Sequence, residues 1–184
     1  MILTDREIKN SISAGLIEIQ PQPQADAFAS TTVDLTLDRH LRVFKPIQHG
    51  VSMAIDPGMS GYSARTALEG LTEPVEISSN GYDLESGRLI LGWTSETIKL
   101  PVQGRVAARV EGKSNLARLG LAIHVTAPTI HAGFQGTIQL EIINHGPVPI
   151  RLRTGMRVCQ LVFEVTLGMP DNAYQGQFLG QQSA

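Results

Sequence analysis

Residues Gly136 to Thr166 read GTIQLEIINHGPVPIRLRTGMRVCQLVFEVT and contain three apolar runs separated by turn residues. In the first run, Ile138, Leu140 and Ile142 alternate with other residues, the period of two that is typical of a half-buried β-strand. The turn signal Asn-His-Gly-Pro follows this run. Short strands separated by such turns indicate an antiparallel barrel or jelly roll. We therefore predict strands at 136–144, 148–153 and 157–166.

Toward the N-terminus the strand pattern continues, and one helix is predicted. Strand patterns occur at 33–43, 88–93, 97–100, 105–110 and 121–127. Thr4 and Glu7 form a capping-box pattern, and Ile8, Ile12 and Leu16 recur at four-residue spacing, so a short helix should begin the chain. Residues 45–87 are rich in Gly, Pro, Ser and Asn and are interpreted as loops with one or two minor strands. The predicted fold class is all-β with a short N-terminal helix.

Size and composition favour a single unit. The 184 residues fit one domain, with a flexible polar tail from about Met169. The net charge is −2, with 15 Lys and Arg against 17 Asp and Glu, which does not indicate polymeric nucleic acid as a partner. The single Cys159 cannot form an internal disulfide and lies in an apolar run, so we interpret it as a core residue. Since no window approaches the ~18 apolar residues of a membrane span, we expect no membrane partner and a cytoplasmic location.

The stretch from Val110 to Leu121, VEGKSNLARLGL, is the best candidate for binding chemistry. A strand should end at Gly112, and a short helical turn should begin near Leu116. Free main-chain N–H groups at such a start, close to Lys113 and Arg118, would suit a phosphate chain. The alternative from spacing alone is a solvated connection between two strands.

This stretch resembles the phosphate-binding signature of the dCTP deaminase family, which typically reads Glu-Gly-Arg-Ser-Ser-Leu-Ala-Arg-Leu-Gly-Leu. The resemblance covers nearly all of residues 88 to 167 and touches both ends of the chain. Its further motifs are Thr32–Leu35, His124–Ala127, Gly133–Glu141, Thr154–Leu161 and Tyr174–Phe178. It implies a dUTPase-like distorted barrel or jelly roll over residues 1–184 and a homotrimer whose sites lie between subunits. One chain would supply the loop 113–118 and another the Glu141 strand.

Glu141 is the strongest catalytic candidate under this resemblance. By itself, a glutamate alternating with Leu140 and Ile142 is more often a solvated strand residue. The matching glutamate of the family moves the protons: it takes one from water, protonates the ring nitrogen and helps ammonia to leave. A carboxyl group can do this because it both accepts and donates a proton.

The resemblance implies companion roles for other residues. Ser114 and the carbonyl of Ala127 would orient the attacking water, and Arg118 would hold that network and the phosphates. The backbone from Ile138 to Leu140 would read the base edge. His124 and Thr126 should share the polar face of a strand, and we favour a hydrogen-bonded structural role for His124. The full nucleotide-binding set is predicted to be Lys113, Ser114, Asn115, Leu116, Ala117, Arg118, His131, Gln139, Leu140, Glu141, Tyr174, Gln177 and Gln181.

The sequence predicts no catalytic metal ligands. Zinc deaminases need a His-x-Glu motif and a Pro-Cys-x-x-Cys pair, and this sequence has no His-x-Glu and one cysteine. Carboxylate chemistry should therefore replace zinc. Mg²⁺ is still expected as the companion of the nucleotide triphosphate.

Four positions depart from the family pattern where the ligand should lie. Lys113 replaces Arg, which keeps the charge and loses bidentate phosphate contact. Asn115 replaces the second Ser, and Gln177 replaces a Lys of the tail. His131 replaces an Asp that normally contacts the sugar 3′-hydroxyl and, in dUTPases, helps to activate water.

Three functions follow in order of preference. The first is dCTP deaminase, converting dCTP and water to dUTP and ammonia. The second is a bifunctional enzyme that also releases pyrophosphate and yields dUMP, although such enzymes often have Gly and an aromatic residue in place of Pro128 and Thr129. The third is a non-catalytic nucleotide-binding homologue, which the four departures favour and the retained Ser114, Arg118, Ala127 and Glu141 oppose.

Overall fold

The computed structural model describes residues 1–46, 54–172, 174 and 180. Three α-helices and two 3₁₀ turns lie in these residues: α1 (Asp5–Ser13), η1 (Ala25–Ala27), α2 (Ala64–Leu71), η2 (Val102–Gly104) and α3 (Ser114–Ala117). The strands are β1 (Glu18–Gln20), β2 (Val33–Phe44), β3 (Thr72–Glu76), β4 (Tyr82–Leu84), β5 (Leu89–Lys99), β6 (Val106–Gly112), β7 (Leu121–Ala122), β8 (Thr129–Ile130), β9 (Gln135–Asn144), β10 (Ile150–Leu152) and β11 (Arg157–Val165).

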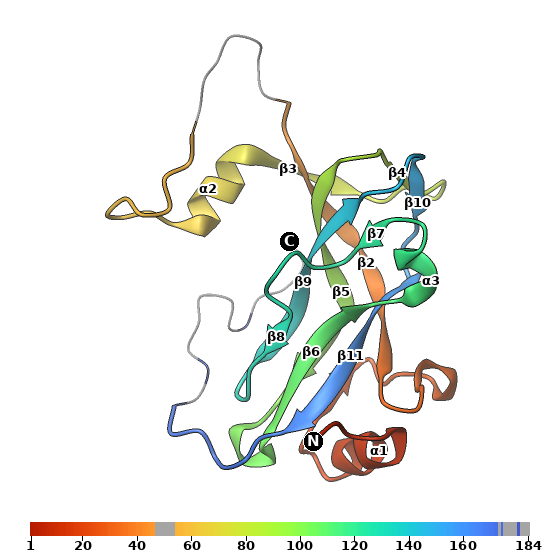
Figure 1. Cartoon of the computed structure of the whole chain (residues 1–184), viewed down its shortest axis with the longest axis vertical. Helices are drawn as coiled ribbons and strands as arrows, with labels where there is room; N and C mark the ends of the chain where they lie inside the picture. The colour runs from red at the N-terminus through yellow and green to blue at the C-terminus, as the bar shows by residue number, and fades with distance from the viewer. Residues whose placement is uncertain (47–53, 173, 175–179, 181–184) are drawn as a thin grey trace.

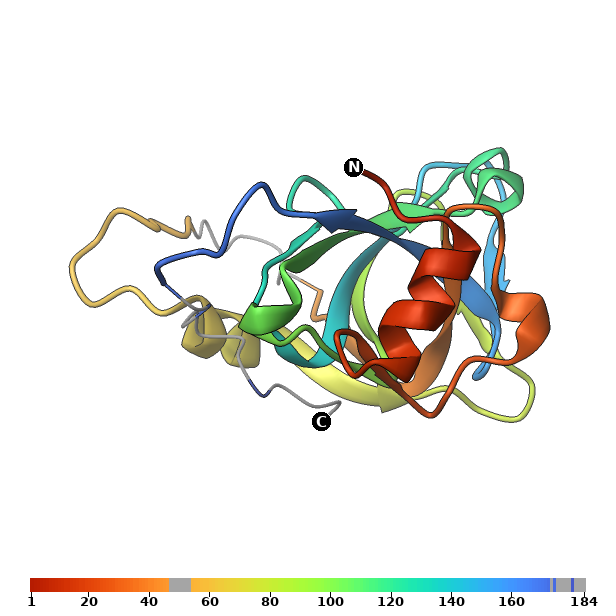
Figure 2. The same cartoon turned by 90° about the horizontal axis from the view of Figure 1, so that it is seen from below.

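Most of the described strands form one curled antiparallel sheet. Its order is β7-β9-β5-β2-β11-β6-β8, and β1 and β3 pair with β5 and β2 outside this path. β4 and β10 form a separate two-stranded sheet. The sheet curls round so that β8 faces β9 across the interior, and α1 covers one end of the barrel (Figures 1 and 2). The predicted all-β fold with an N-terminal helix is confirmed.

The core follows the alternation seen in the sequence. Ile138, Leu140 and Ile142 of β9 are buried, whereas Gln139 and Glu141 are half-exposed. β11 buries its apolar residues in the same way, and the free Cys159 lies fully inside it. Because Cys159 is buried, the pKa of its thiol is raised well above the ordinary value. Its prediction as a core residue is confirmed.

Several element predictions need correction. The two strands predicted at 88–93 and 97–100 are parts of one strand, β5 (Leu89–Lys99), which carries an irregularity between Trp93 and Thr97 in its pairing with β9. The strand predicted at 121–127 ends at Ala122, and Val125, which should have shared the apolar face, is 52% exposed. The helix α2 was not predicted at all; it stands away from the barrel (Figure 1) and has no fully buried residue.

The N-terminal helix is confirmed, but its predicted capping box is not formed. Thr4 is the N-cap residue of α1, yet its side chain makes no capping hydrogen bond. The N-terminus is held instead by main-chain bonds: the Leu3 N–H donates to Phe163 O (2.9 Å) and the Asp5 N–H to Ser30 O (2.9 Å). Burial of Ile8 then fixes the helix against the core.

Two glycines fix α3 and β7 against the turn after β9. Gly120 has φ +97°, and a Cβ built there would lie 2.2 Å from the main-chain nitrogen of Gly146. The His145 N–H donates to Gly120 O (2.8 Å). Asn144 is buried and accepts from the Gly146 N–H at 2.8 Å. Only glycine tolerates both this backbone angle and this approach.

Candidate active site

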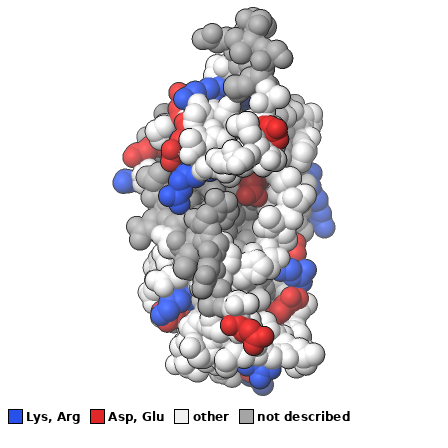
Figure 3. Space-filling view, turned by 90° about the vertical axis from the view of Figure 1, so that its left-hand side faces the viewer, with Lys and Arg blue, Asp and Glu red and all other residues white. Residues whose placement is uncertain are grey.

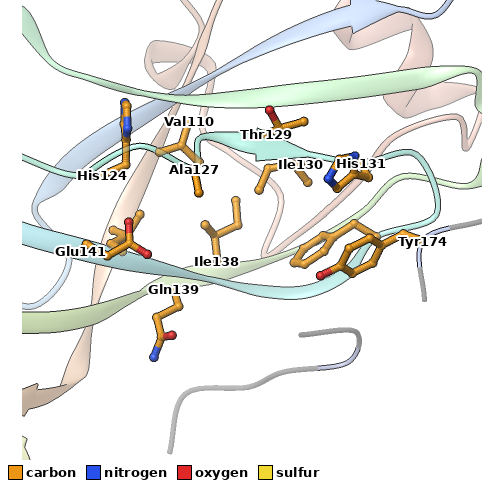
Figure 4. A pocket seen from close by; sticks show the side chains of 12 residues that line it. Val110, His124, Ala127, Thr129, Ile130, His131, Ile138, Gln139, Glu141 and Tyr174 are labelled. Carbon is orange, nitrogen blue, oxygen red and sulfur yellow. The ribbon is translucent and has the colours of Figure 1, made fainter. Parts of the chain in front are cut away.

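A cavity of about 250 Å³ opens between β8 and β9. It is slightly smaller than the ~300–1,000 Å³ of sites for drug-sized ligands, so its size suits a nucleobase with part of a sugar. Glu141 and His124 lie at one end and His131 and Tyr174 at the other, with Ile138 between them (Figure 4). Its lining residues are Val110, His124, Ala127, Thr129, Ile130, His131, Phe134, Ile138, Gln139, Leu140, Glu141 and Tyr174.

One wall of the cavity is a strand edge that no described strand covers. On the side away from β5, β9 pairs with β7 only at Ile143 and Asn144. The Ile138 N–H points the other way and donates to Thr94 Oγ1 of β5 (3.0 Å). Because main-chain groups of successive strand residues point to opposite sides, the N–H and C=O of Gln139 face the uncovered edge. Paired donors and acceptors of this kind can recognise the edge of a heterocyclic base.

Glu141 brings a carboxylate to one end of this cavity. Its side chain is half-buried, and Oε2 accepts a long hydrogen bond of 3.4 Å from the Val125 N–H. At this distance the bond is weak, so the carboxylate keeps acceptor capacity for another partner. A carboxylate beside an enclosed, partly apolar space can exchange protons with a bound molecule and a water.

His124 lies beside Glu141 and differs from its predicted role. We expected a hydrogen-bonded structural histidine, but its Nδ1 is buried without a hydrogen-bond partner among the described residues. The strand that should have carried it ends two residues earlier, at Ala122. The half-buried ring instead lines the cavity.

An aromatic pair forms the opposite end of the cavity. The rings of His131 and Tyr174 stack with centroids 5.4 Å apart and an interplanar angle of 15°. Phe134 packs against the same tyrosine at 6.0 Å. The Tyr174 N–H donates to Ala132 O at 3.4 Å, which holds Tyr174 beside the residues that follow β8. His131 therefore presents a ring at this end of the cavity, where the family pattern would place a carboxylate.

The predicted phosphate loop lies apart from this cavity within one chain. α3 is a single turn: the N–H groups of Leu116 and Ala117 donate to Lys113 O at 3.0 and 2.8 Å. Ser114 and Arg118 are exposed. None of the predicted residues Lys113, Ser114, Asn115, Leu116, Ala117 and Arg118 lines the cavity.

The structure therefore brings together only part of the predicted site. Ala127, His131, Gln139, Leu140, Glu141 and Tyr174 share the cavity, while Gln177 and Gln181 fall outside the described residues. Sequence reasoning did not assign site roles to Val110, Thr129, Ile130 and Phe134. The alternation of β6 could have indicated that Val110 faces inward, but β8 is too short to show a pattern of its own.

The described surface outside the cavity shows no single-sign charge cluster in Figure 3 and no group of metal ligands. Basic and acidic residues are interspersed on the face shown in Figure 3. In the part of the chain that the structure describes, no three His, Cys, Asp or Glu side chains gather closely enough to hold a metal ion. Within the same residues, no helix has the length and apolarity to cross a bilayer.

The fold and the cavity define a class of protein: a curled antiparallel barrel with a small cavity that is lined by a carboxylate and by a strand edge that no described strand covers. A family model described as dCTP deaminase-like matches residues 2–166. The chain belongs to this family. A dCTP deaminase of Rhodospirillum rubrum is 39% identical over 177 residues, covering 95% of this chain and 87% of the relative. A dUMP-forming dCTP deaminase of Methanosphaera stadtmanae is 35% identical over 186 residues, covering 98% and 89%.

A solved structure has the same fold. The crystal structure of 2′-deoxycytidine 5′-triphosphate deaminase from Agrobacterium tumefaciens matches with a TM-score of 0.67 and 25% identity. The match covers 89% of this chain and 48% of that chain, so this chain spans about half of its length.

Proposed function

We propose that this protein is a dCTP deaminase, which hydrolyses the 4-amino group of dCTP to give dUTP and ammonia. The observation that carries the proposal is the position of Glu141, a half-buried carboxylate in a base-sized cavity, one wall of which is the edge of β9 that no described strand covers. Membership of the dCTP deaminase-like family supports the substrate class. The relatives named above support it further.

In the proposed reaction Glu141 moves two protons in turn. The carboxylate takes a proton from water as the water oxygen bonds to C4 of the cytosine, and the electron pair of the C4=N3 bond moves to N3. Glu141 then gives this proton to N3. In the second half, the proton of the new C4 hydroxyl passes through Glu141 to the amino nitrogen. The C4–N bond breaks, ammonia leaves and the C4=O of uracil forms.

Other residues have proposed roles in the same reaction. The main chain at Gln139 would read the base edge, and the carbonyl of Ala127 would hold the attacking water. Ser114 and Arg118 are proposed to come from a neighbouring chain, because within one chain they do not line the cavity that Glu141 shares. We therefore propose a homotrimer with its sites between subunits. Most soluble oligomers are symmetric. Each chain of the trimer would then contribute Glu141 to one site and Ser114 and Arg118 to a neighbouring site.

Mg²⁺ is proposed to accompany the triphosphate rather than to occupy a site built by this chain. The described residues offer no cluster of ligands for an ion, whereas phosphate oxygens and water suit Mg²⁺. The ion would screen the phosphate charge during binding. Because the proposed substrate is a free nucleotide, we propose a cytoplasmic location.

A bifunctional reaction giving dUMP and pyrophosphate is the second candidate. Two relatives carry the name dCTP deaminase, dUMP-forming. However, splitting the phosphate chain needs a second activated water, and His131 presents a stacked imidazole where the family pattern has a carboxylate. An imidazole cannot offer two anionic oxygens to a water and a sugar hydroxyl.

One reaction mixture tests these functions. Ammonia, dUTP, dUMP and pyrophosphate are quantified together over a panel of cytidine and deoxycytidine mono-, di- and triphosphates with Mg²⁺. We expect ammonia and dUTP in equal amounts from dCTP and no pyrophosphate. Equimolar pyrophosphate would establish the bifunctional enzyme, and the absence of ammonia from every cytosine nucleotide would favour the non-catalytic homologue.

A further inference from the structure

Lys113 is already engaged by an ion pair inside the chain. Its Nζ donates to Asp34 Oδ1 of β2 at 2.5 Å. The two side chains are only 22% and 13% exposed, unlike the surface pair of Lys9 and Asp5, which is 48% and 43% exposed. The Lys113 ammonium is therefore directed at the sheet.

Gly112, the residue before Lys113, is held by a second polar contact. Gln160 of β11 donates through Nε2 to Gly112 O at 3.1 Å. Its Oε1 in turn accepts from the buried Thr32 hydroxyl at 3.0 Å. Two consecutive residues, Gly112 and Lys113, are thus fixed by β11 and β2 just where β6 ends.

Lys113 also shapes the turn that follows. Its main-chain oxygen accepts from the N–H groups of Leu116 and Ala117, which closes the single turn of α3. Arg118 follows, with its N–H donating to Ser114 O at 3.1 Å. The positions of Ser114 and Arg118 therefore depend on where Lys113 is held.

Breaking the ion pair with Asp34 so that the Lys113 ammonium could bind a phosphate would be unfavourable. Asp34 would lose the ammonium that donates to it, and among the described residues no other hydrogen bond to this mostly buried carboxylate is present; Arg157 attracts it without bonding to it. Removing one member of such a pair is more costly than the pair itself is stabilising. The ammonium gains little from exchanging one anion for another.

We propose that Lys113 and Asp34 are positioning residues, which together set Ser114 and Arg118 for the reaction, and that Lys113 is not a phosphate ligand. This inference rests on the proposed deaminase function, and it replaces the phosphate-binding role that the family resemblance implied for Lys113. Asp34 becomes a site-determining residue although it does not line the cavity.

The test compares Lys113→Met, Asp34→Asn and the double variant, with Lys9→Met as the matched control for loss of a paired lysine. For each, kcat and KM are measured with deoxycytidine mono- and triphosphate. Nucleotide affinity is measured by calorimetry in the Glu141→Gln background, and thermal unfolding monitors the fold. Lys113→Arg should restore function, since a guanidinium can keep the pair with Asp34.

A positioning role predicts a specific pattern. Each single variant should lower kcat by a similar factor, about tenfold to a hundredfold, because small displacements of reacting groups are costly. The double variant should be no worse than the poorer single variant, and Lys9→Met should match wild type. The loss of affinity should be equal for the mono- and triphosphate.

The opposite pattern would overturn the inference. A phosphate ligand predicts that Lys113→Met weakens triphosphate binding far more than monophosphate binding, while Asp34→Asn leaves binding intact or improves it. A wild-type protein that binds nucleotides without releasing ammonia would refute the proposed function alone, and the two affinity profiles would still decide the role of Lys113. Absence of any nucleotide binding would refute both.

Discussion

At the residue scale, the reacting end of the cavity depends on few side chains. Glu141 brings the carboxylate, and the long contact from the Val125 N–H leaves it free to bind water. His124 lies beside it, and its buried Nδ1 has no hydrogen-bond partner in the part of the chain that the structure describes. At the far end, His131 and Tyr174 present ring faces. Under the proposed function, we expect substitutions at the first end to affect deamination and substitutions at the far end to affect sugar selectivity.

Glu141→Gln should abolish deamination while leaving nucleotide affinity and the unfolding temperature nearly unchanged. The amide keeps the shape of the side chain and cannot transfer the proton, a contribution worth ~10²- to 10⁴-fold in rate. Ammonia release measured over hours, alongside calorimetric binding of dCTP, checks this. Retention of more than half of the wild-type turnover would remove Glu141 from the mechanism.

His131→Asp should raise the preference for dCTP over 2′,3′-dideoxycytidine triphosphate, which lacks the 3′-hydroxyl, by about tenfold if the new carboxylate makes one charged hydrogen bond to that hydroxyl. His131→Phe is the matched control, because it keeps a ring beside Tyr174 and adds no acceptor. The ratio of kcat/KM for the two nucleotides measures the effect. An unchanged ratio in His131→Asp would show that this end of the cavity does not contact the sugar.

Cys159 should resist alkylation in the native protein at about pH 8. The thiolate is the reactive form, and burial raises the pKa of this thiol, so the group stays protonated at that pH. Iodoacetamide labelling followed by mass spectrometry should show modification only after unfolding. Rapid labelling of the folded chain would contradict the packing of β11.

At the scale of elements, the barrel strands and the loop glycines carry the arrangement of the site. Gly120→Ala should lower the free energy of unfolding by at least about 2 kcal/mol, since a Cβ is strained at positive φ and meets the backbone of Gly146. Thermal and urea unfolding measure this loss. Gly70→Ala is the control: its Cβ would have open space within α2, and alanine favours a helix. Equal effects of the two substitutions would refute the close approach.

The sequence predicted elements wherever local pattern determines them. β9 and β11 alternate between inward and outward residues, so their existence and faces were correct. α2 buries no residue fully, and its only clear signal was Ser63, whose hydroxyl caps the helix by accepting from the Thr66 N–H. The strand after Gly120 was extended too far because apolar residues continue to Val125, beyond the pairing with β9.

The site was only partly predictable, for a physical reason. Its cavity forms where the curled sheet brings β8 opposite β9. No single segment of the sequence predicts such a long-range arrangement. The family resemblance brought Glu141 and His131 into one hypothesis. It also predicted that Lys113 binds the phosphates, whereas in the structure Lys113 forms an ion pair with Asp34.

At the scale of the whole molecule, the separation of α3 from the cavity can be tested by mixing chains. Glu141→Gln and Arg118→Ala proteins should each be inactive. When they are unfolded together and refolded as a mixture, a site regains both groups when its Glu141 comes from an Arg118→Ala chain and its Arg118 comes from a Glu141→Gln chain. Random assembly of equal amounts into cyclic trimers gives about a quarter of the wild-type activity.

The controls for this experiment are the two variants refolded separately and mixed without unfolding. Both should stay inactive if chains do not exchange. A refolded mixture without recovered activity, together with a trimeric mass in solution, would place both groups of each site in a single chain.

The single tryptophan offers a further use of the β5–β9 pair. Trp93 is 4% exposed and stands opposite Gln139 in the strand register. With one indole in the chain, fluorescence comes from a single, known place, one strand away from the cavity wall. Its emission should shift to longer wavelength when the barrel opens. Each variant can thus be examined optically for intact strand pairing before any substrate is added, so that a lost reaction is never mistaken for a lost fold.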